Sequence, residues 1–115
     1  MNPSGEMVLK NTGIDVFSAP VFRGGFKGIF SFDVLQAEGS SPSLTVAVQT
    51  KNTADNLDSG AGGWNDVSGA SANPTGTGLN AIIASELKEQ VRLRFNMGGG
   101  ASAWMRIFVF EPSWQ

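Results

Sequence analysis

The sequence predicts an all-β fold, an antiparallel β-sandwich or jelly-roll-like domain with seven or eight short strands and at most one short helical turn. Three observations predict it. Apolar and polar residues alternate with a period of two in several segments, so one face of each strand lies on a core. Stretches rich in glycine, serine and asparagine separate these segments. The length of 115 residues suits a single domain over 1–115, with a flexible arm at 1–5 and a tail at 112–115.

The first half of the chain is expected to hold the ranges 6–10, 14–22, 26–35 and 44–51 as strands. Pro20 interrupts the second range, which suits a sheet edge or a bend because proline donates no backbone hydrogen bond. The third range is rich in aromatic and β-branched residues, which favour strands. The fourth alternates most regularly, and one of its faces carries the large apolar residues Leu44, Val46 and Val48.

The second half is expected to hold a short strand at 64–67 and another at 79–83, flanked by polar loops at 52–63 and 68–78. The segment after residue 83 is either a turn or one turn of helix over 85–90.

The last two strands are expected at 91–97 and 104–110. The first alternates between apolar residues and the polar Arg92, Arg94 and Asn96. The second is apolar at nearly every position and is predicted to be a central strand buried on both faces. A glycine run at 98–100 joins them, so they are expected to form a hairpin.

Composition argues against an enzyme. The chain has no cysteine, histidine or tyrosine, so it lacks a thiol nucleophile and the commonest general base and metal ligand. We therefore expect neither catalytic residues nor cofactors. The net charge is −2 and no basic run exists, which disfavours direct binding of nucleic acid. No apolar stretch approaches the length of about 20 residues that a membrane span needs, so no membrane partner is expected.

The loop at 52–63 resembles a calcium-binding loop imperfectly. Positions 1, 5, 6 and 12 of that pattern are occupied by Asp55, Ser59, Gly60 and Asp66. Position 3 is Leu57, which has no ligand atom, although Asp58 lies next to it. We expect no metal site, and the sequence leaves open whether this loop binds calcium or a glycan.

Candidate interface residues are the aromatic, proline and arginine side chains Trp114, Trp64, Pro112, Arg92 and Arg94. Trp114 follows Pro112 in the tail, where a large aromatic ring packs either on its own domain or on a neighbouring subunit. Trp64 lies between the two polar loops, either as a core residue beneath them or as a stacking surface for a sugar.

Several segments resemble small structural proteins encoded beside the capsid genes of tailed bacteriophages, namely head decoration, cement or stabilisation proteins with a β-sandwich or jelly-roll fold. The likeness lies in residues 44–50, in Trp64-Asn65-Asp66-Val67, and in Val91-Arg92-Leu93-Arg94-Phe95 before the glycine run and closing strand. This resemblance implies a non-enzymatic virion protein, made in the host cytoplasm. It would bind the major capsid or other virion proteins of a head lattice as a trimer or other cyclic homo-oligomer.

Charged residues make up only 16% of the chain, and a surface so poor in charge is suited to packing against neighbours. Two alternatives stay open. One is a phage tail component. The other is a carbohydrate- or receptor-binding β-sandwich in which Trp64 or Trp114 stacks on the ligand.

Overall fold

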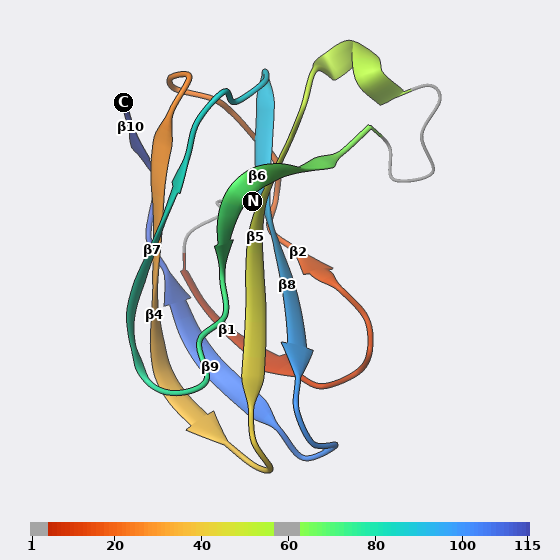
Figure 1. Ribbon diagram of the computed structural model, residues 1–115, viewed down its shortest axis with the longest axis vertical. Helices are drawn as coiled ribbons and strands as arrows, with labels where there is room; N and C mark the ends of the chain where they lie inside the picture. Colours follow the sequence, from red (N-terminus) through yellow and green to blue (C-terminus); the bar gives the residue numbers. More distant parts are fainter. Residues whose placement is uncertain (1–4, 57–62) are drawn as a thin grey trace.

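A computed structural model describes residues 5–56 and 63–115 and shows two five-stranded antiparallel sheets packed face to face (Figure 1). The expected all-β sandwich is thereby confirmed. Sheet A consists of β1 (Gly5–Lys10), β4 (Gly28–Glu38), β7 (Gly78–Ala84), β9 (Trp104–Val109) and β10 (Ser113–Trp114). Sheet B consists of β2 (Val16–Phe17), β3 (Val21–Phe22), β5 (Ser43–Lys51), β6 (Asn65–Ala72) and β8 (Gln90–Gly98). One 3-10 turn, η1 (Thr53–Asn56), follows β5.

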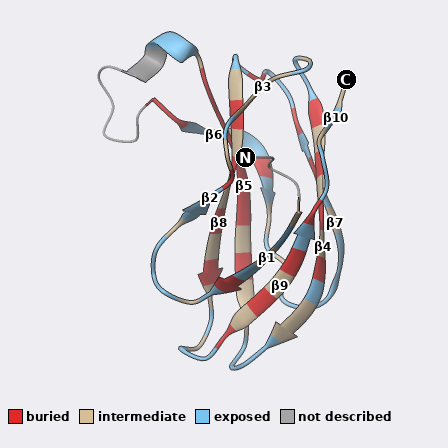
Figure 2. Cartoon of the chain, turned by 180° about the vertical axis from the view of Figure 1, so that it is seen from behind, coloured by how far each residue is buried: buried red, intermediate tan, exposed pale blue. Residues whose placement is uncertain are grey.

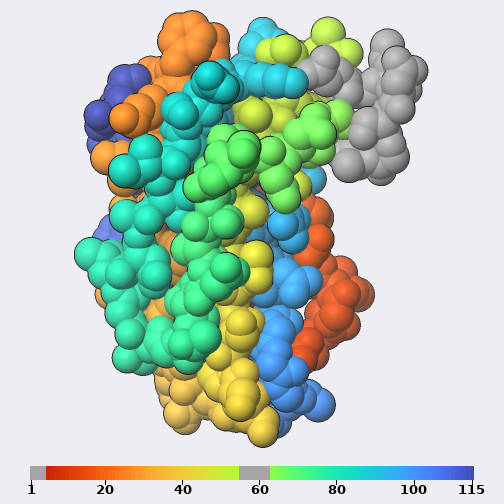
Figure 3. Space-filling model, in the orientation of Figure 1, coloured from red at the N-terminus to blue at the C-terminus, as the bar shows by residue number. Residues whose placement is uncertain are grey.

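In each sheet, two separate strands pair with different stretches of one long neighbouring strand. Sheet B runs in the order β2-β8-β5-β6, and β3 pairs with a second stretch of β8 on the same side as β2. Pro20 lies between β2 and β3, at the edge of sheet B. The predicted edge position of this proline is confirmed. Sheet A runs β1-β9-β4, with β7 on the other side of β4 and β10 pairing with the start of β4. β6 and β7, one from each sheet, lie side by side along the front of the molecule (Figure 3).

The core lies between the sheets and is formed by buried side chains of the long strands. Buried and less buried residues alternate along several of these strands (Figure 2). In β8 every second residue is buried, and the same alternation runs through the first half of β4. Burial of these apolar side chains supplies the main stabilisation of the fold. The largest fully buried side chains include Phe32, Leu44, Phe95, Met105 and Ile107.

The predicted hairpin of the last two strands is wrong. β8 belongs to sheet B and β9 to sheet A, so the glycine run carries the chain from one sheet to the other. Gly99 has a φ of +100°, and a β-carbon there would clash with the carbonyl oxygen of Ser41. The amide of Gly100 donates to the carbonyl of Ser40 at 2.7 Å, which anchors the crossing against the β4–β5 turn.

β9 is central but not buried on both faces as predicted. Phe108 is 37% exposed and Phe110, just after the strand, is 41% exposed. Their neighbours Met105, Ile107 and Val109 face the core. The outer face of sheet A has no further layer over it in the part of the chain that the structure describes, so an apolar strand here has one uncovered side (Figure 2).

Two local expectations change and one alternative is decided. β6 continues to Ala72 and so takes up part of the predicted second loop. For the segment after residue 83 the turn is confirmed and the helical turn over 85–90 is not; Glu86 adopts a φ of +56° there, and the 3-10 turn lies at η1. The tail expected at 112–115 contains β10, whose Trp114 pairs with Gly28. Residues 1–4 of the predicted arm lie outside the described residues, and Gly5 begins β1.

The described part of the chain holds no helix with the length and apolar character that crossing a membrane requires.

Candidate functional site

The outer face of sheet B combines aromatic rings with a connected set of polar side chains. Alternation along β8 turns Arg92, Arg94 and Asn96 away from the core, and pairing places Gln49 of β5 opposite Arg92. Phe17 of β2 pairs with Arg94 on the other side of β8. We call this surface the sheet B platform, defined by Asp15, Phe17, Gln49, Trp64, Asp66, Arg92, Arg94 and Asn96.

Arg92 is held at the centre of the platform by two aromatic rings. Its guanidinium carbon lies 3.8 Å from the ring centroid of Phe17 and 4.4 Å from that of Trp64. The two rings come from opposite sides of β8, one from β2 and one from the segment that enters β6. The Nε of Arg92 donates a hydrogen bond to Oε1 of Gln49 at 2.8 Å. Burial lowers the pKa of the Arg92 guanidinium, which nevertheless stays protonated at neutral pH.

A chain of hydrogen bonds continues from Arg92 across the platform. Gln49 Nε2 donates to Asp66 Oδ1 at 2.9 Å, and the second carboxylate oxygen of Asp66 accepts from Arg94 at 3.1 Å. Arg94 also lies 3.7 Å from Asp15. Asp15 in turn accepts a hydrogen bond from the amide of Asn96 at 2.7 Å. The polar side chains are therefore oriented by one another before any ligand arrives.

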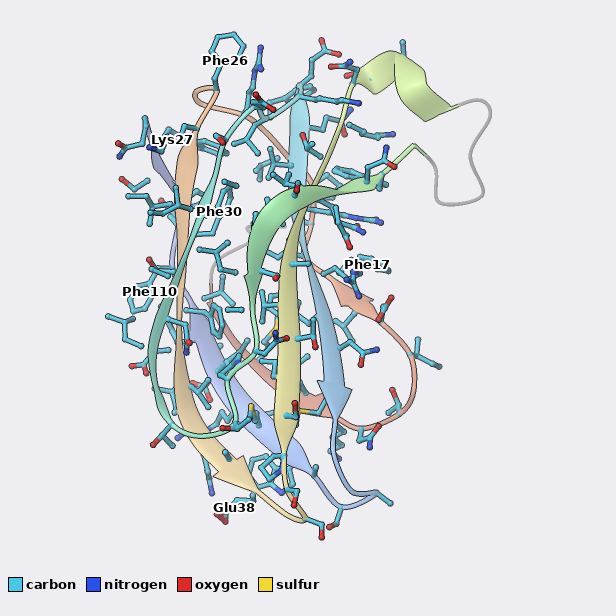
Figure 4. All side chains as sticks on the ribbon, in the orientation of Figure 1. Phe17, Phe26, Lys27, Phe30, Glu38 and Phe110 are labelled. Carbon is cyan, nitrogen blue, oxygen red and sulfur yellow. The ribbon has the colours of Figure 1, made fainter. Side chains whose placement is uncertain are left out.

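Of the two alternatives for Trp64, the structure favours the buried one. Trp64 is only 9% exposed, so it is not an open stacking surface. It is not part of the main cluster between the sheets, and Arg92 and Lys51 lie over its ring. The accessible aromatic residue of the platform is Phe17, at 40% exposure (Figure 4). Phe17 was not predicted as a site residue because its strand has only two residues, too few for alternation to be recognised.

Trp114 packs on its own domain. Its ring lies 5.7 Å from that of Phe30 at an interplanar angle of 89°, an edge-to-face contact. Gly24 leaves room for the indole, since a β-carbon there would lie within 2.5 Å of Trp114 Cγ. Pro112, half-buried, precedes β10 and leads the chain into it. Among the five candidate interface residues, the structure thus brings Trp64, Arg92 and Arg94 together on the outer face of sheet B. Trp114 lies in β10 of sheet A, and Pro112 directly precedes that strand.

The calcium-loop pattern falls mainly on residues 57–62, which lie outside the described residues and include Leu57, Asp58, Ser59 and Gly60. Asp66, its last position, is hydrogen-bonded to Gln49 and Arg94. Within the residues that the structure describes, no group of three or more acidic side chains is arranged to hold a metal ion.

The outer face of sheet A has a different chemistry. Exposed apolar side chains from β1, β7 and β9 lie on this face. Phe110 lies there too, on the side of the molecule away from Phe17 (Figure 4). Arg106 on this face pairs with Glu6 at 3.1 Å. The exposed apolar residues are Val8, Leu79, Ile83, Phe108 and Phe110.

No family model matches the chain, and no curated protein matches it in sequence. Among solved structures, one described as "CBM4 structure and function", a carbohydrate-binding module, is similar with a TM-score of 0.54 and 16% identity, over 98% of this chain and 67% of that one. "Crystal structure of PirA" has a TM-score of 0.49 and 13% identity, over 96% of this chain and 95% of that one.

A third is the CBM22-1–GH10 part of Clostridium thermocellum xylanase 10B with xylohexaose. Its TM-score is 0.44 at 11% identity, over 95% of this chain and 25% of that one. Only the first likeness is strong enough to carry an argument. By fold, the chain is therefore a β-sandwich similar to a carbohydrate-binding module.

Proposed function

We propose that this protein is a non-catalytic carbohydrate-binding module that holds a glycan on the sheet B platform. The observation that carries the proposal is the position of Phe17, an exposed aromatic ring beside a preformed network of planar polar side chains. The fold likeness to a CBM4 structure supports a binding module of this architecture.

The chemistry of the platform is complementary to that of a sugar. A pyranose ring has a face of C–H groups that packs on an aromatic ring and a rim of hydroxyl groups that both donate and accept hydrogen bonds. Phe17 offers the apolar surface, while Asp15, Arg94 and Asn96 offer planar groups with several donors and acceptors. Because these side chains are already ordered by one another, binding costs less conformational entropy.

The same network holds its carboxylates in place. Asp66 and Asp15 both face Arg94, and each accepts a further hydrogen bond from an amide side chain. The two carboxylates therefore have defined orientations within the network. This arrangement fits a role in orienting a ligand.

The test is a glycan array followed by titration calorimetry with the best-bound glycan. Phe17→Ala should weaken binding about tenfold, which corresponds to about 1.4 kcal/mol, because the stacking surface is lost. Phe110→Ala is the matched control, since Phe110 is 41% exposed against 40% for Phe17 and lies on the opposite sheet (Figure 4). Equal losses in both variants, or no glycan bound by the unmodified protein, would refute the proposal.

A second candidate is a structural module that assembles with copies of itself, as a virion decoration protein would. The observation that favours it is the group of exposed apolar side chains on the outer face of sheet A. None of the three similar structures is described as a phage or capsid protein. Sedimentation velocity should then show an oligomer that Phe108→Ser dissociates, and a monomer at every concentration would exclude this role.

A further inference from the structure

The two arginines of the sheet B platform differ in how their charges are balanced. Arg94 faces two carboxylates, those of Asp66 and Asp15. Arg92, two residues earlier on the same face, has no carboxylate partner among the described residues; its one hydrogen bond goes from Nε to the neutral side chain of Gln49. The platform therefore carries a cation at its centre whose charge the described part of the chain leaves uncompensated.

The terminal nitrogens of Arg92 are the groups left available. Neither has an acceptor among the described residues. No buried side-chain nitrogen or oxygen in this part of the chain lacks a hydrogen-bond partner, so these nitrogens are reached by solvent. The rings of Phe17 and Trp64 lie over the guanidinium, and Gln49 occupies the Nε edge. What remains is the end of the guanidinium, with two parallel N–H donors held in one orientation.

We infer, building on the proposed function, that the sheet B platform selects glycans with an anionic group, which Arg92 binds through its two terminal nitrogens. The group is either the carboxylate of a uronic acid or a sulfate ester. Two anionic oxygens match the planar guanidinium fork and form a bidentate pair. Phe17 lies over the guanidinium and is 40% exposed, so the sugar that bears the anion would lie next to its ring.

A neutral glycan could accept hydrogen bonds from the N–H groups of Arg92 but would not balance the positive charge of its guanidinium. Partial burial penalises the cation, as the lowered pKa of Arg92 shows, and the two aromatic rings offset only part of this penalty. An anion in this position regains electrostatic energy that a hydroxyl group does not supply. Because Arg94 is already neutralised by carboxylates, the preference is expected to depend on Arg92.

The experiment uses pairs of glycans that differ only in charge. Oligogalacturonate is compared with its methyl ester, and a carrageenan oligosaccharide with its desulfated form; the two pairs separate the carboxylate from the sulfate. Calorimetry should show the acidic member of at least one pair bound ten or more times as tightly as the neutral member. Raising the salt concentration should reduce this ratio.

Variants then assign the preference to Arg92. Arg92→Gln should reduce the acidic-to-neutral ratio to about one, and Arg92→Lys should restore only part of it because lysine has no planar fork. Arg106→Gln is the control, since Arg106 lies on sheet A and is paired with Glu6. Circular dichroism checks that each variant is folded.

The outcomes separate this inference from the proposed function. Equal affinity of the unmodified protein for both members of each pair, or an unchanged ratio in folded Arg92→Gln, overturns the inference and leaves glycan binding in place. Should Arg92→Gln fail to fold, the ratio and its salt dependence in the unmodified protein decide the matter. Failure to bind any glycan overturns the proposed function and the inference with it.

Discussion

At the scale of single residues, Gly24 and Trp114 depend on each other. The indole of Trp114 occupies the space that a β-carbon on Gly24 would need. The ring packs edge-to-face on Phe30 and contacts the core. Trp114 is thereby an internal support for the start of β4, and its position near the end of the chain does not leave it free.

Gly24→Ala should displace the indole and lower the free energy of unfolding by about 1–3 kcal/mol, because overpacking forces neighbouring atoms apart. Denaturant titration followed by tryptophan fluorescence measures the loss. Gly76→Ala is the matched control, since a β-carbon at Gly76 meets no atom within 4 Å, and its effect should stay within about 0.5 kcal/mol. Similar losses in both variants would contradict the packing role assigned to Trp114.

At the scale of elements, a serine side chain supplies a hydrogen bond to β8 at the point where the edge strand of sheet B is interrupted. Ser18 lies between β2 and β3 and is 5% exposed. Its amide donates to the carbonyl of Leu93 at 2.9 Å, and its hydroxyl accepts from the amide of Leu93 at 2.8 Å. The hydroxyl therefore completes the hydrogen bonding of β8 at the place where the edge strand is interrupted before Pro20.

Ser18→Ala should leave the buried Leu93 amide without an acceptor and lower the free energy of unfolding by about 1–3 kcal/mol. Hydrogen exchange of the Leu93 amide should accelerate correspondingly. Ser71→Ala, at an exposed position of β6, should change stability by no more than about 0.5 kcal/mol. If the Leu93 amide stays fully protected in Ser18→Ala, the hydroxyl does not have this role.

At the scale of the whole molecule, the two sheets share one core, and their outer faces differ in chemistry. Phe32 of sheet A and Phe95 of sheet B are both fully buried between the sheets. The sheet B platform lies outside one sheet and the exposed apolar residues outside the other. A domain of this size is stabilised by about 5–15 kcal/mol in total, so a single core side chain supplies a large share of it.

Phe95→Ala should lower the free energy of unfolding by about 3–5 kcal/mol, because it removes buried contacts and leaves a cavity. Phe110→Ala removes the same side chain from a position that is 41% exposed and should cost much less. Thermal unfolding measured by circular dichroism compares the two. Equal costs would mean that the core does not lie where the structure places it.

The regular strands were well predicted from the sequence. The ranges 44–51 and 91–97 differ by at most one residue at either end from β5 (Ser43–Lys51) and β8 (Gln90–Gly98). The pairing of strands was predicted less well, since the expected hairpin of 91–97 with 104–110 is divided between two sheets. Glycines that permit a tight hairpin also permit a crossing, and the sequence pattern is the same for both.

For the candidate site, the placement of Arg92 and Arg94 on the outer face of their strand could be predicted from the alternation of residues alone. The positions of Phe17 and Trp64 over one arginine, and of Asp15 and Asp66 beside the other, could not. Side-chain alternation is a local property of an extended backbone, which any few residues of a strand display. Neighbours across strands depend on which strands pair and in what register, and this follows from the packing of the whole chain.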